Sequence, residues 1–541
     1  MKRLYILIIV LFCLPYLHGQ DTIALPSDQV EVVKNYEAII LQARKKTFSV
    51  DPTQRDYDPI VFNYAKKNPK VIEFERPAPI IQALSYRAED DRPEDVKDGT
   101  VYGSYGTLNT LNAGAAFHYY IEDWIEAGFQ VDHFSAKDND IAFQKMGKTE
   151  ASVYGGYYLN PRTKVKLNLH GGFDRFNTGA LAIPDSIFST QEINEYGANL
   201  NFSHTSFENL GLVVRSQLDF NRIDVRHDSL NESLLGARIS ILKSINDKIN
   251  LEIPTHLTQL MGAFDENYFD LKLTPKVRFK ADKYFGYVGA LFVTGTEISA
   301  FRPLVHLTLP KLFEEVNVHV FAKAEYSRNG FHSLISDNPY LIPSSAFFYS
   351  PEIISKYGFS LDRDINRLNV FLSTSYVRLD STVNYQFSAV AARRFVTQVV
   401  DRSEINIKAK LSYRLSSSFV ARTFLKRRIF IEDDIVVTYV PEWTVGGALD
   451  YKSLNKKLDL SLSLKYLSSR NYSIFPSGIG EPAPSPMDGF MDVSASATYR
   501  INPSVEVFAR GTNLLAPDGA QIWFGHPIFE RQIWGGLRVN I

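Results

Sequence analysis

The chain is poor in cysteine: it has one among 541 residues, and that one, Cys13, lies near the N-terminus. Disulfides and thiolate metal sites are therefore excluded for the rest of the chain. A surplus of one charge is also lacking, because 59 Lys and Arg stand against 60 Asp and Glu. Nucleic-acid binding would need a clustered basic surplus, so no nucleic acid is expected as a partner.

Long apolar runs are lacking beyond residue 20. The one such run, residues 4–14, follows Lys2 and Arg3 and precedes Gly19, a pattern typical of a secretory signal peptide cleaved after Gly19. The run is too short to cross a membrane as a helix. We therefore expect residues 1–19 to be a signal peptide. If the mature chain lies in a membrane, it must cross it with strands.

Motifs for catalysis and cofactor binding are lacking as well. The sequence contains no His-Glu-x-x-His zinc motif and no Gly-x-Ser-x-Gly nucleophile elbow. Asp138-Asn139-Asp140 begins like a calcium loop but lacks the glycine and the final glutamate of that motif. We expect no enzyme, no cofactor and no metal site.

What the sequence does contain is a period of two, which begins at residue 99 and continues to residue 541. In residues 457–466, 405–413 and 316–326, apolar side chains alternate with polar ones. Successive side chains of a strand point to opposite faces, so each segment has one apolar and one polar face. A soluble all-β protein such as a propeller shows the same alternation and is the alternative at this point.

The connections favour a membrane barrel. Short turns at residues 160–162, 207–209, 246–248, 453–455 and 502–504 alternate with long stretches at 178–192, 330–353, 381–402, 469–488 and 517–530. Membrane barrels have this asymmetry of short periplasmic turns and long outer loops. We predict an all-β fold, a transmembrane antiparallel up-and-down barrel of about 22 strands, within a range of roughly 20–24, over residues 99–541. Residues 383–387 then belong to an outer loop or to a strand extension.

The ends of the strands and of the chain agree with a barrel. Tyr326, Tyr413, Tyr466 and Tyr499 each close an apolar stripe, as aromatic girdle residues do. The chain ends on an alternating segment in which we place Gly536, Val539 and Ile541 on one face, as the strand that closes the barrel. Residues 20–98 hold many prolines, and we expect a periplasmic or lumen-filling segment there, partly helical or extended.

Several short motifs resemble a known family. Residues 505–516 (VEVFARGTNLLA), with Trp523 and residues 535–541 (GGLRVNI), resemble the end of TonB-dependent receptor barrels. Residues 30–37 (VEVVKNYE), 101–106 (VYGSYG) and 113–120 (AGAAFHYY) are similar to a plug-less branch of such barrels in Bacteroidota, and residues 338–340 (NPY) fit it too. The resemblance implies an outer-membrane barrel that is surrounded by outer-membrane lipid and inserted by the barrel-assembly machinery.

The interval before the barrel departs from that family. A receptor plug is a folded domain at this place, but residues 21–98 are broken by proline and lack a four-stranded pattern. Barrels of roughly 16–18 strands already leave an aqueous channel, so a larger one would leak if it were empty. We expect the lumen to be filled by the N-terminal segment, by outer loops folded inward, or by a periplasmic or membrane partner.

One group of residues is a candidate contact for a ligand or a partner. Aromatic side chains gather in the 330–353 loop, at Phe331, Tyr340, Phe347, Phe348 and Tyr349. They form either a stacking surface or a small core of the loop itself. For the whole chain we predict transport of a solute across the outer membrane, with a partner supplying the gating. The alternative is a structural or accessory subunit of a larger outer-membrane assembly.

Overall fold

The structure is a computed structural model, and the residues that it describes all belong to one compact unit, Leu41–Ile541. They are residues 42–43, 99–121, 124–137, 145–160, 162–177, 190–206, 211–226, 230–262, 267–281, 283–313, 315–338, 340–341, 349–388, 395–431, 436–453, 455, 457–475, 483–515, 521–524, 526–527 and 531–541. The expected signal peptide, and all of residues 20–98 apart from Gln42 and Ala43, lie outside them.

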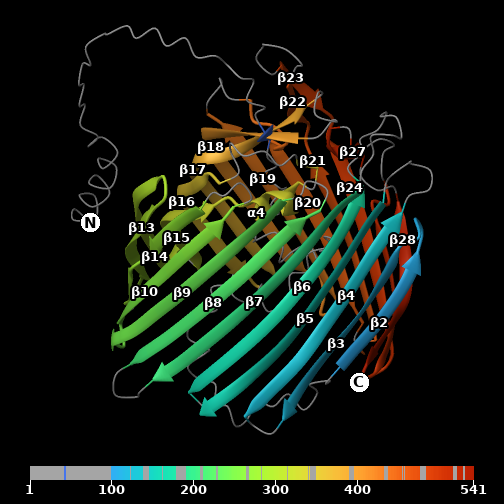
Figure 1. Cartoon of the computed structure of the whole chain (residues 1–541), viewed down its shortest axis with the longest axis horizontal. Helices are drawn as coiled ribbons and strands as arrows, with labels where there is room; N and C mark the ends of the chain where they lie inside the picture. The colour runs from blue at the N-terminus through green and yellow to red at the C-terminus, as the bar shows by residue number, and fades with distance from the viewer. Residues whose placement is uncertain are drawn as a thin grey trace. The chain divides into compact units, whose positions relative to one another are not determined.

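The described residues form a closed antiparallel barrel (Figure 1). Eleven wall strands run from the end that holds the C-terminus, the terminal end, to the opposite loop end: β2 (Gly99–Gly106), β4 (Ile125–Lys137), β6 (Thr163–Asn177), β8 (Leu212–Val225), β10 (Ile249–Met261), β13 (Phe285–Gly295), β15 (Val316–Arg328), β17 (Leu368–Ser388), β19 (Phe419–Phe430), β21 (Leu458–Leu467) and β25 (Val505–Thr512).

The strands that return to the terminal end are β3 (Leu111–Ile121), β5 (Lys145–Asn160), β7 (Thr190–Ser206), β9 (Leu230–Asn246), β11 (Asn267–Leu273) with β12 (Lys276–Lys280), β14 (Ile298–Phe313), β16 (Pro351–Ile365), β18 (Phe395–Arg414), β20 (Trp443–Lys452), β24 (Phe490–Asn502) and β28 (Gln532–Asn540). Both β11 and β12 pair with β10 and with β13, so together they fill one position. The wall therefore has 22 strand positions, as predicted.

Among the described residues, six further elements lie outside the wall: β1 (Gln42–Ala43), α4 (Phe331–Asp337), β22 (Arg470–Phe475), β23 (Ala483–Met487), β26 (Gln521–Trp523) and β27 (His526–Pro527). β1 pairs in parallel with Thr397 of β18. Among the described residues, no helix is long and apolar enough to cross a membrane.

The wall closes where the first and the last strand meet. β28 pairs with β25 on one side and with β2 on the other, and Gly99 and Ile541 exchange backbone hydrogen bonds of 3.2 and 2.8 Å. We predicted that Gly536, Val539 and Ile541 lie on one face of this strand, and the prediction is wrong for Gly536. Leu537, Val539 and Ile541 are exposed on the outer face, whereas Gly536 lies on the inner face, because its position is even and theirs are odd.

The outer face of the wall is apolar. On β21, Leu460, Leu462, Leu464 and Tyr466 are each at least 40% exposed, while Ser461 between them donates a hydrogen bond to Asp450 at 2.8 Å. Alternating exposed leucines on neighbouring strands are stable only against lipid, so this barrel spans a membrane. Tyr413 and Tyr499 are exposed at the terminal end, as expected for a girdle.

Tyr326 does not lie in this girdle, contrary to the prediction. It is 9% exposed and packs with Leu291, Leu304 and Ile353 in a small apolar cluster. β14 pairs with β15 no further toward the loop end than Val305 and Ala322. Closer to the loop end than this pair, inward side chains of β13 and β14, such as Leu291 and Leu304, therefore cover Tyr326.

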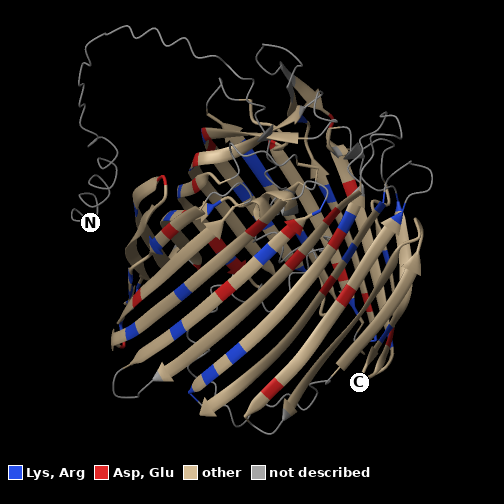
Figure 2. Ribbon diagram, viewed as in Figure 1, with Lys and Arg blue, Asp and Glu red and all other residues tan. Residues whose placement is uncertain are grey.

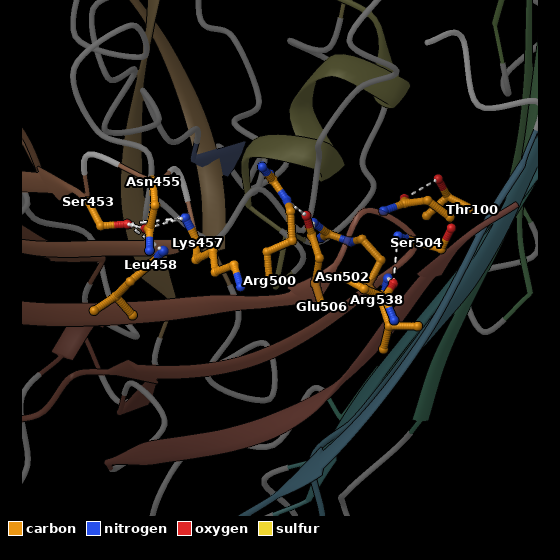
Figure 3. A network of polar contacts seen from close by, with 12 residues as sticks. Thr100, Ser453, Asn455, Lys457, Leu458, Arg500, Asn502, Ser504, Glu506 and Arg538 are labelled. Carbon is orange, nitrogen blue, oxygen red and sulfur yellow. Dashed lines mark hydrogen bonds and ion pairs between the residues drawn. The ribbon is translucent and has the colours of Figure 1, made fainter.

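Short turns join the strands at the terminal end, and asparagine side chains hold several of them (Figure 3). Asn502 Oδ1 accepts the backbone N–H groups of Ser504 and Val505, both at 2.9 Å. Asn160 and Asn246 each accept the N–H two residues further on, also at 2.9 Å. These Asx turns replace the strand hydrogen bonds that end at the turn, which is why asparagine recurs there.

The long connections all lie at the loop end. One of the predicted loops, residues 381–402, is mostly strand, because β17 continues to Ser388 and β18 begins at Phe395. Residues 383–387 pair with β18 throughout and are therefore a strand extension. One of the two assignments left open by the sequence is thus correct.

Candidate functional site: the barrel mouth

The connection between β15 and β16, residues 329–350, lies at the loop end and carries α4; we call it the mouth loop. Its neck is closed by two hydrogen bonds from Asn329, one to the Ser350 carbonyl at 3.0 Å and one to the Ser350 hydroxyl at 3.1 Å. Within α4, Phe331, Leu334 and Ile335 are each at most 3% exposed. Their spacing places them on one face of the helix, and that face is buried.

The wall supplies the surface that α4 covers. Ile193 of β7, Ile223 and Val225 of β8, Leu230 of β9 and Leu260 of β10 join the same apolar cluster as Phe331 and Leu334. By strand register these side chains share the inward face with polar residues such as Asn199 and Asp219. The inner wall therefore changes from polar to apolar where it meets the mouth loop.

A buried carboxylate fixes the start of α4. Glu232 of β9 is 3% exposed, and it accepts the N–H of Phe331 at 2.5 Å and the N–H of His332 at 3.1 Å. These N–H groups have no partner within the helix, and a negative charge at a helix N-terminus is favourable. The His332 ring lies 3.2 Å from Glu195 of β7. Two wall carboxylates thus hold the helix over β7–β9.

An ion pair fixes the base of the loop. Arg328, the last residue of β15, donates two hydrogen bonds to Asp270 of β11 at 2.7 and 2.8 Å, and both side chains are nearly fully buried. The same guanidinium donates to the Tyr349 carbonyl at 2.6 Å. A bidentate Arg–carboxylate pair has a defined geometry, so it sets the angle at which both ends of the loop leave the wall.

The middle of the mouth loop reaches a different part of the wall. Leu341 forms a parallel bridge with Phe395 of β18, and the Phe395 N–H donates to the Tyr340 carbonyl at 3.2 Å. β9 and β18 are not neighbours in the barrel. A loop that starts at β15 and is attached to both of them therefore extends across the mouth (Figure 1).

Aromatic side chains from the extended ends of β17 and β18 and from two other outer connections complete the same cluster. The Trp523 ring lies 4.7 Å from Tyr439 and 5.2 Å from both Tyr385 and Phe395, measured between centroids. All four are at most 3% exposed. Burial raises the pKa of the Tyr439 hydroxyl well above its ordinary value and lowers the pKa of Arg470, in β22, to about 10. The outer connections thus share one core at the mouth.

The aromatic residues proposed from the sequence have different positions. Phe331 and Tyr349 are buried in this cluster, and Tyr340 packs against it with its ring 6.1 Å from Phe176. Burial raises the pKa of Tyr340 to about 12. Phe347 and Phe348 lie outside the described residues. In the described conformation Phe331 and Tyr349 form part of a core rather than an exposed stacking surface.

Sequence reasoning missed the polar anchors of the mouth loop, Glu232, Glu195, Asp270 and Arg328. The first three are carboxylates near the loop end of a strand, and such residues are also common as solvated strand ends. The inward apolar residues Ile223 and Val225 were a stronger signal, since they break the polar lumen pattern of β8.

Below the mouth, charged residues occur along the wall strands (Figure 2). On one side carboxylates and lysines are matched: Glu126 lies 2.9 Å from Lys164 and 2.8 Å from Lys166. No cluster of three or more His, Cys, Asp or Glu side chains suited to a metal ion occurs among the described residues.

No protein-family model matches the sequence, and no curated protein is detectably similar to it. Solved structures with the same fold are nevertheless found. The FrpB iron transporter from Neisseria meningitidis is 12% identical with a TM-score of 0.64, and the match covers 82% of this chain and 81% of that one. The siderophore receptor PirA from Acinetobacter baumannii is 11% identical with a TM-score of 0.63, covering 82% and 80%.

The copper transporter OprC is 13% identical with a TM-score of 0.62, and the match covers 82% of this chain and 80% of that one. These neighbours are transporters and receptors rather than enzymes. The chain therefore has the barrel fold of TonB-dependent outer-membrane receptors.

Proposed function

We propose that the chain is an outer-membrane barrel that carries a solute across the outer membrane, and that the mouth loop is its gate. The observation that carries this proposal is the mouth loop itself, which is anchored to β9, β11 and β18 and extends across a closed wall. A wall of 22 strands would leak without such a closure. A structural subunit would have no need of a loop attached across its own mouth.

The polar anchors of the mouth loop are suited to a gate because they are few. Glu232 and Asp270 hold the loop through hydrogen bonds of defined geometry, whereas the wall strands are joined by continuous ladders. A ligand or a partner that competes for these contacts would weaken the attachment of the loop without opening the wall, and the apolar cluster would then be its remaining attachment. Release would expose Phe331, Tyr340 and Tyr349 as aromatic surface for a ligand or a partner. Phe347 and Phe348, which lie outside the described residues, remain candidates for the same contact from the sequence.

The finer assignment follows the sequence motifs. We place the chain in the plug-less, TonB-receptor-like branch of Bacteroidota, with residues 1–19 as a cleaved signal peptide and residues 20–98 as a periplasmic or lumen-filling segment. The support is the proline-rich interval before β2 and the similarity of residues 505–516 to the end of receptor barrels. A periplasmic or membrane partner would then supply the gating energy.

The test is a reversible lock on the mouth loop. Bridge partners on adjacent strands lie ~5 Å apart, which is within the range that a disulfide can span. Leu341→Cys with Phe395→Cys would therefore join the loop to β18, and no other cysteine follows Cys13. The purified full chain is recorded in planar bilayers, with each single cysteine variant as the control.

We expect oxidation of the double variant to suppress channel openings at least tenfold, and a reductant to restore them. The single variants should not respond to either treatment. Large constant conductance of the wild type would contradict an occluded mouth. Equal conductance of the locked and the reduced double variant would show that the mouth loop is not the gate.

A further inference from the structure

The wall has a seam where β14 and β15 separate near the loop end. Their register ends at Val305 and Ala322, so residues 298–304 of β14 and 323–328 of β15 are not ladder partners of each other. The junctions on both sides of the seam are complete, since β13 and β14 pair up to their connecting turn and β15 pairs with β16 along its whole length. Among β13–β16, the ladder is therefore interrupted at one junction only.

The loop-end part of β13 and β14, which we call the flap, has one face toward lipid. Phe292 and Phe301 are 45% and 55% exposed on its outer face, and their rings lie 5.0 Å apart. An exposed aromatic pair at this end of the wall is typical of the girdle at a membrane surface. By strand parity, Leu291 and Leu304 belong to the inner face of the flap. The seam thus lies at the depth of the membrane boundary.

The inner face of the flap covers the outer face of β15 and β16. Val320 and its register partner Phe359 are exposed to lipid, and Tyr326 and Ile353 lie on the same faces of these strands by parity. Yet Tyr326 is only 9% exposed and Ile353 only 4%, because both pack against Leu291 of the flap. The two sides of the seam therefore overlap, with an apolar contact between their faces.

Cationic side chains take the place of the ladder at both edges of the overlap. On the edge of β15, Lys272 of β11 donates a hydrogen bond to the Tyr326 carbonyl at 3.2 Å. On the edge of β14, Arg302 donates to the Phe301 carbonyl at 3.0 Å. Arg302 also donates to Asp380 of β17 at 2.8 Å, which holds the flap across β15 and β16. Backbone groups without a ladder partner at membrane depth need such donors.

Arg328 links the seam to the mouth loop. It pairs with Asp270 of β11 and donates to the carbonyl of Thr296, in the turn that joins the two strands of the flap. The same guanidinium donates to the Tyr349 carbonyl of the mouth loop. One side chain of β15 therefore holds both the flap and the mouth loop. A movement of the loop that displaces Arg328 would also loosen the overlap.

We propose that the seam is a lateral portal through which long-chain acyl amphiphiles pass between the lumen and the bilayer. This names the substrate class of the transport proposed above and rests on that proposal. The overlap has the lumen at the edge of β15 and lipid at the edge of β14. An acyl chain that slides between the two apolar faces stays out of water along this path. Because no ladder joins these faces, every strand pair of the wall stays intact as the chain passes.

Photolabelling in vesicles tests the inference. The full chain is reconstituted in phosphatidylcholine vesicles with a diazirine analogue of palmitic acid, and labelled peptides are identified by mass spectrometry. Tyr326 and Ile353 report on entry into the overlap. Phe321, which faces the lumen on β15 by parity with the exposed Val320, reports on passage. Leu462 on the lipid face of β21 reports on labelling by the bulk bilayer.

Two cysteine pairs provide a lock and its control. Arg302→Cys with Asp380→Cys removes the ion pair across the overlap, and a bis-maleimide then joins the same two positions covalently. Leu309→Cys with Val318→Cys joins β14 and β15 outside the seam, where they are register partners. A shift in gel migration on heating confirms that each variant folds as a barrel.

We expect the wild type to be labelled at the overlap and at Phe321, and the first cysteine pair to be labelled at least twofold more before cross-linking. The bis-maleimide should lower this labelling at least fivefold and leave Leu462 unchanged. The control pair should stay within twofold of the wild type in both states. Labelling of Leu462 alone would overturn the inference, and so would equal labelling of the first pair with and without the cross-link.

The outcomes separate this inference from the proposed function. If the seam stays unlabelled while the disulfide lock on the mouth loop still suppresses channel openings, the transport proposal stands for a solute of another class. If the label passes the seam while that lock has no effect on conductance, the mouth loop fails as the gate and the seam is the path of transport.

Discussion

Replacing Glu232 with alanine should release the mouth loop. The carboxylate accepts two backbone N–H groups of α4, at 2.5 and 3.1 Å, from a position that is 3% exposed. A hydrogen bond to a charged group contributes about 1.5–3 kcal/mol. Two such bonds together contribute about 3–6 kcal/mol, so we expect the closure free energy to fall by about 4 kcal/mol.

That loss translates into a large change in channel activity. Each 1.4 kcal/mol is about a tenfold change in an equilibrium constant, so the open population should rise roughly 10³-fold. Single-channel recording of the purified barrel measures it as open probability. Glu232→Gln keeps one acceptor oxygen and loses the charge, so we expect a smaller rise, about tenfold.

The control is Glu150→Gln, another inward carboxylate whose ion partner is Lys148 of the same strand. It should leave the open probability within about twofold of the wild type, since the ion pair of Glu150 is with Lys148 rather than with α4 and contributes only about 1 kcal/mol at its exposure. A folded Glu232→Ala barrel that opens no more often than the wild type would refute the reasoning. So would an equal rise in Glu150→Gln, because then any loss of lumen charge would open the channel.

Three further changes test the wall. Leu462→Arg, on the lipid face, should destabilise the barrel in liposomes by about 2–4 kcal/mol, as measured by urea titration. Ser463→Arg, on the lumen face, should destabilise it much less. Equal losses would contradict the assigned faces. Gly536→Val should prevent closure of the barrel, because an added side chain overlaps the Gly103 carbonyl and Ser104. Gly535→Ala meets only the Phe508 carbonyl at 3.2 Å, so this variant should still migrate as a folded barrel on a gel. Asn502→Ala removes the acceptor of two turn hydrogen bonds and should lower the unfolding free energy by about 1–2 kcal/mol in the same titrations, with conductance unchanged.

The wall could be predicted from the sequence because its two signals are local. Residues 457–466 show period two, and Asn502-Pro503-Ser504 shows turn chemistry, so neither depends on a distant part of the chain. The error at Gly536 has a simple cause, since a face is set by the parity of the position and glycine carries no side chain to reveal it. The covered position of Tyr326 was not predictable, because it depends on where β14 separates from β15.

The mouth loop could be located but not folded from the sequence. Its aromatic residues marked residues 330–353 as special, yet Phe331 and Tyr349 fit an exposed surface and a buried core equally well. The choice depends on Ile193, Ile223 and Leu230, which lie far away in the chain and meet Phe331 only once the barrel is closed. Nothing in the 330–353 segment encodes those partners.

The two parts of the molecule are therefore stabilised by different kinds of contact. The wall depends on backbone pairing between neighbouring strands all around the closed barrel, so its stability is shared among many backbone hydrogen bonds. The mouth loop depends on an apolar cluster, whose contacts do not set the orientation of the loop. It also depends on the carboxylates Glu232 and Asp270, whose hydrogen bonds do set that orientation. Weakening those two carboxylates should consequently change whether the mouth is closed and leave the barrel intact. A gate in a membrane barrel needs that separation, because a wall that opened would expose its strand edges to lipid.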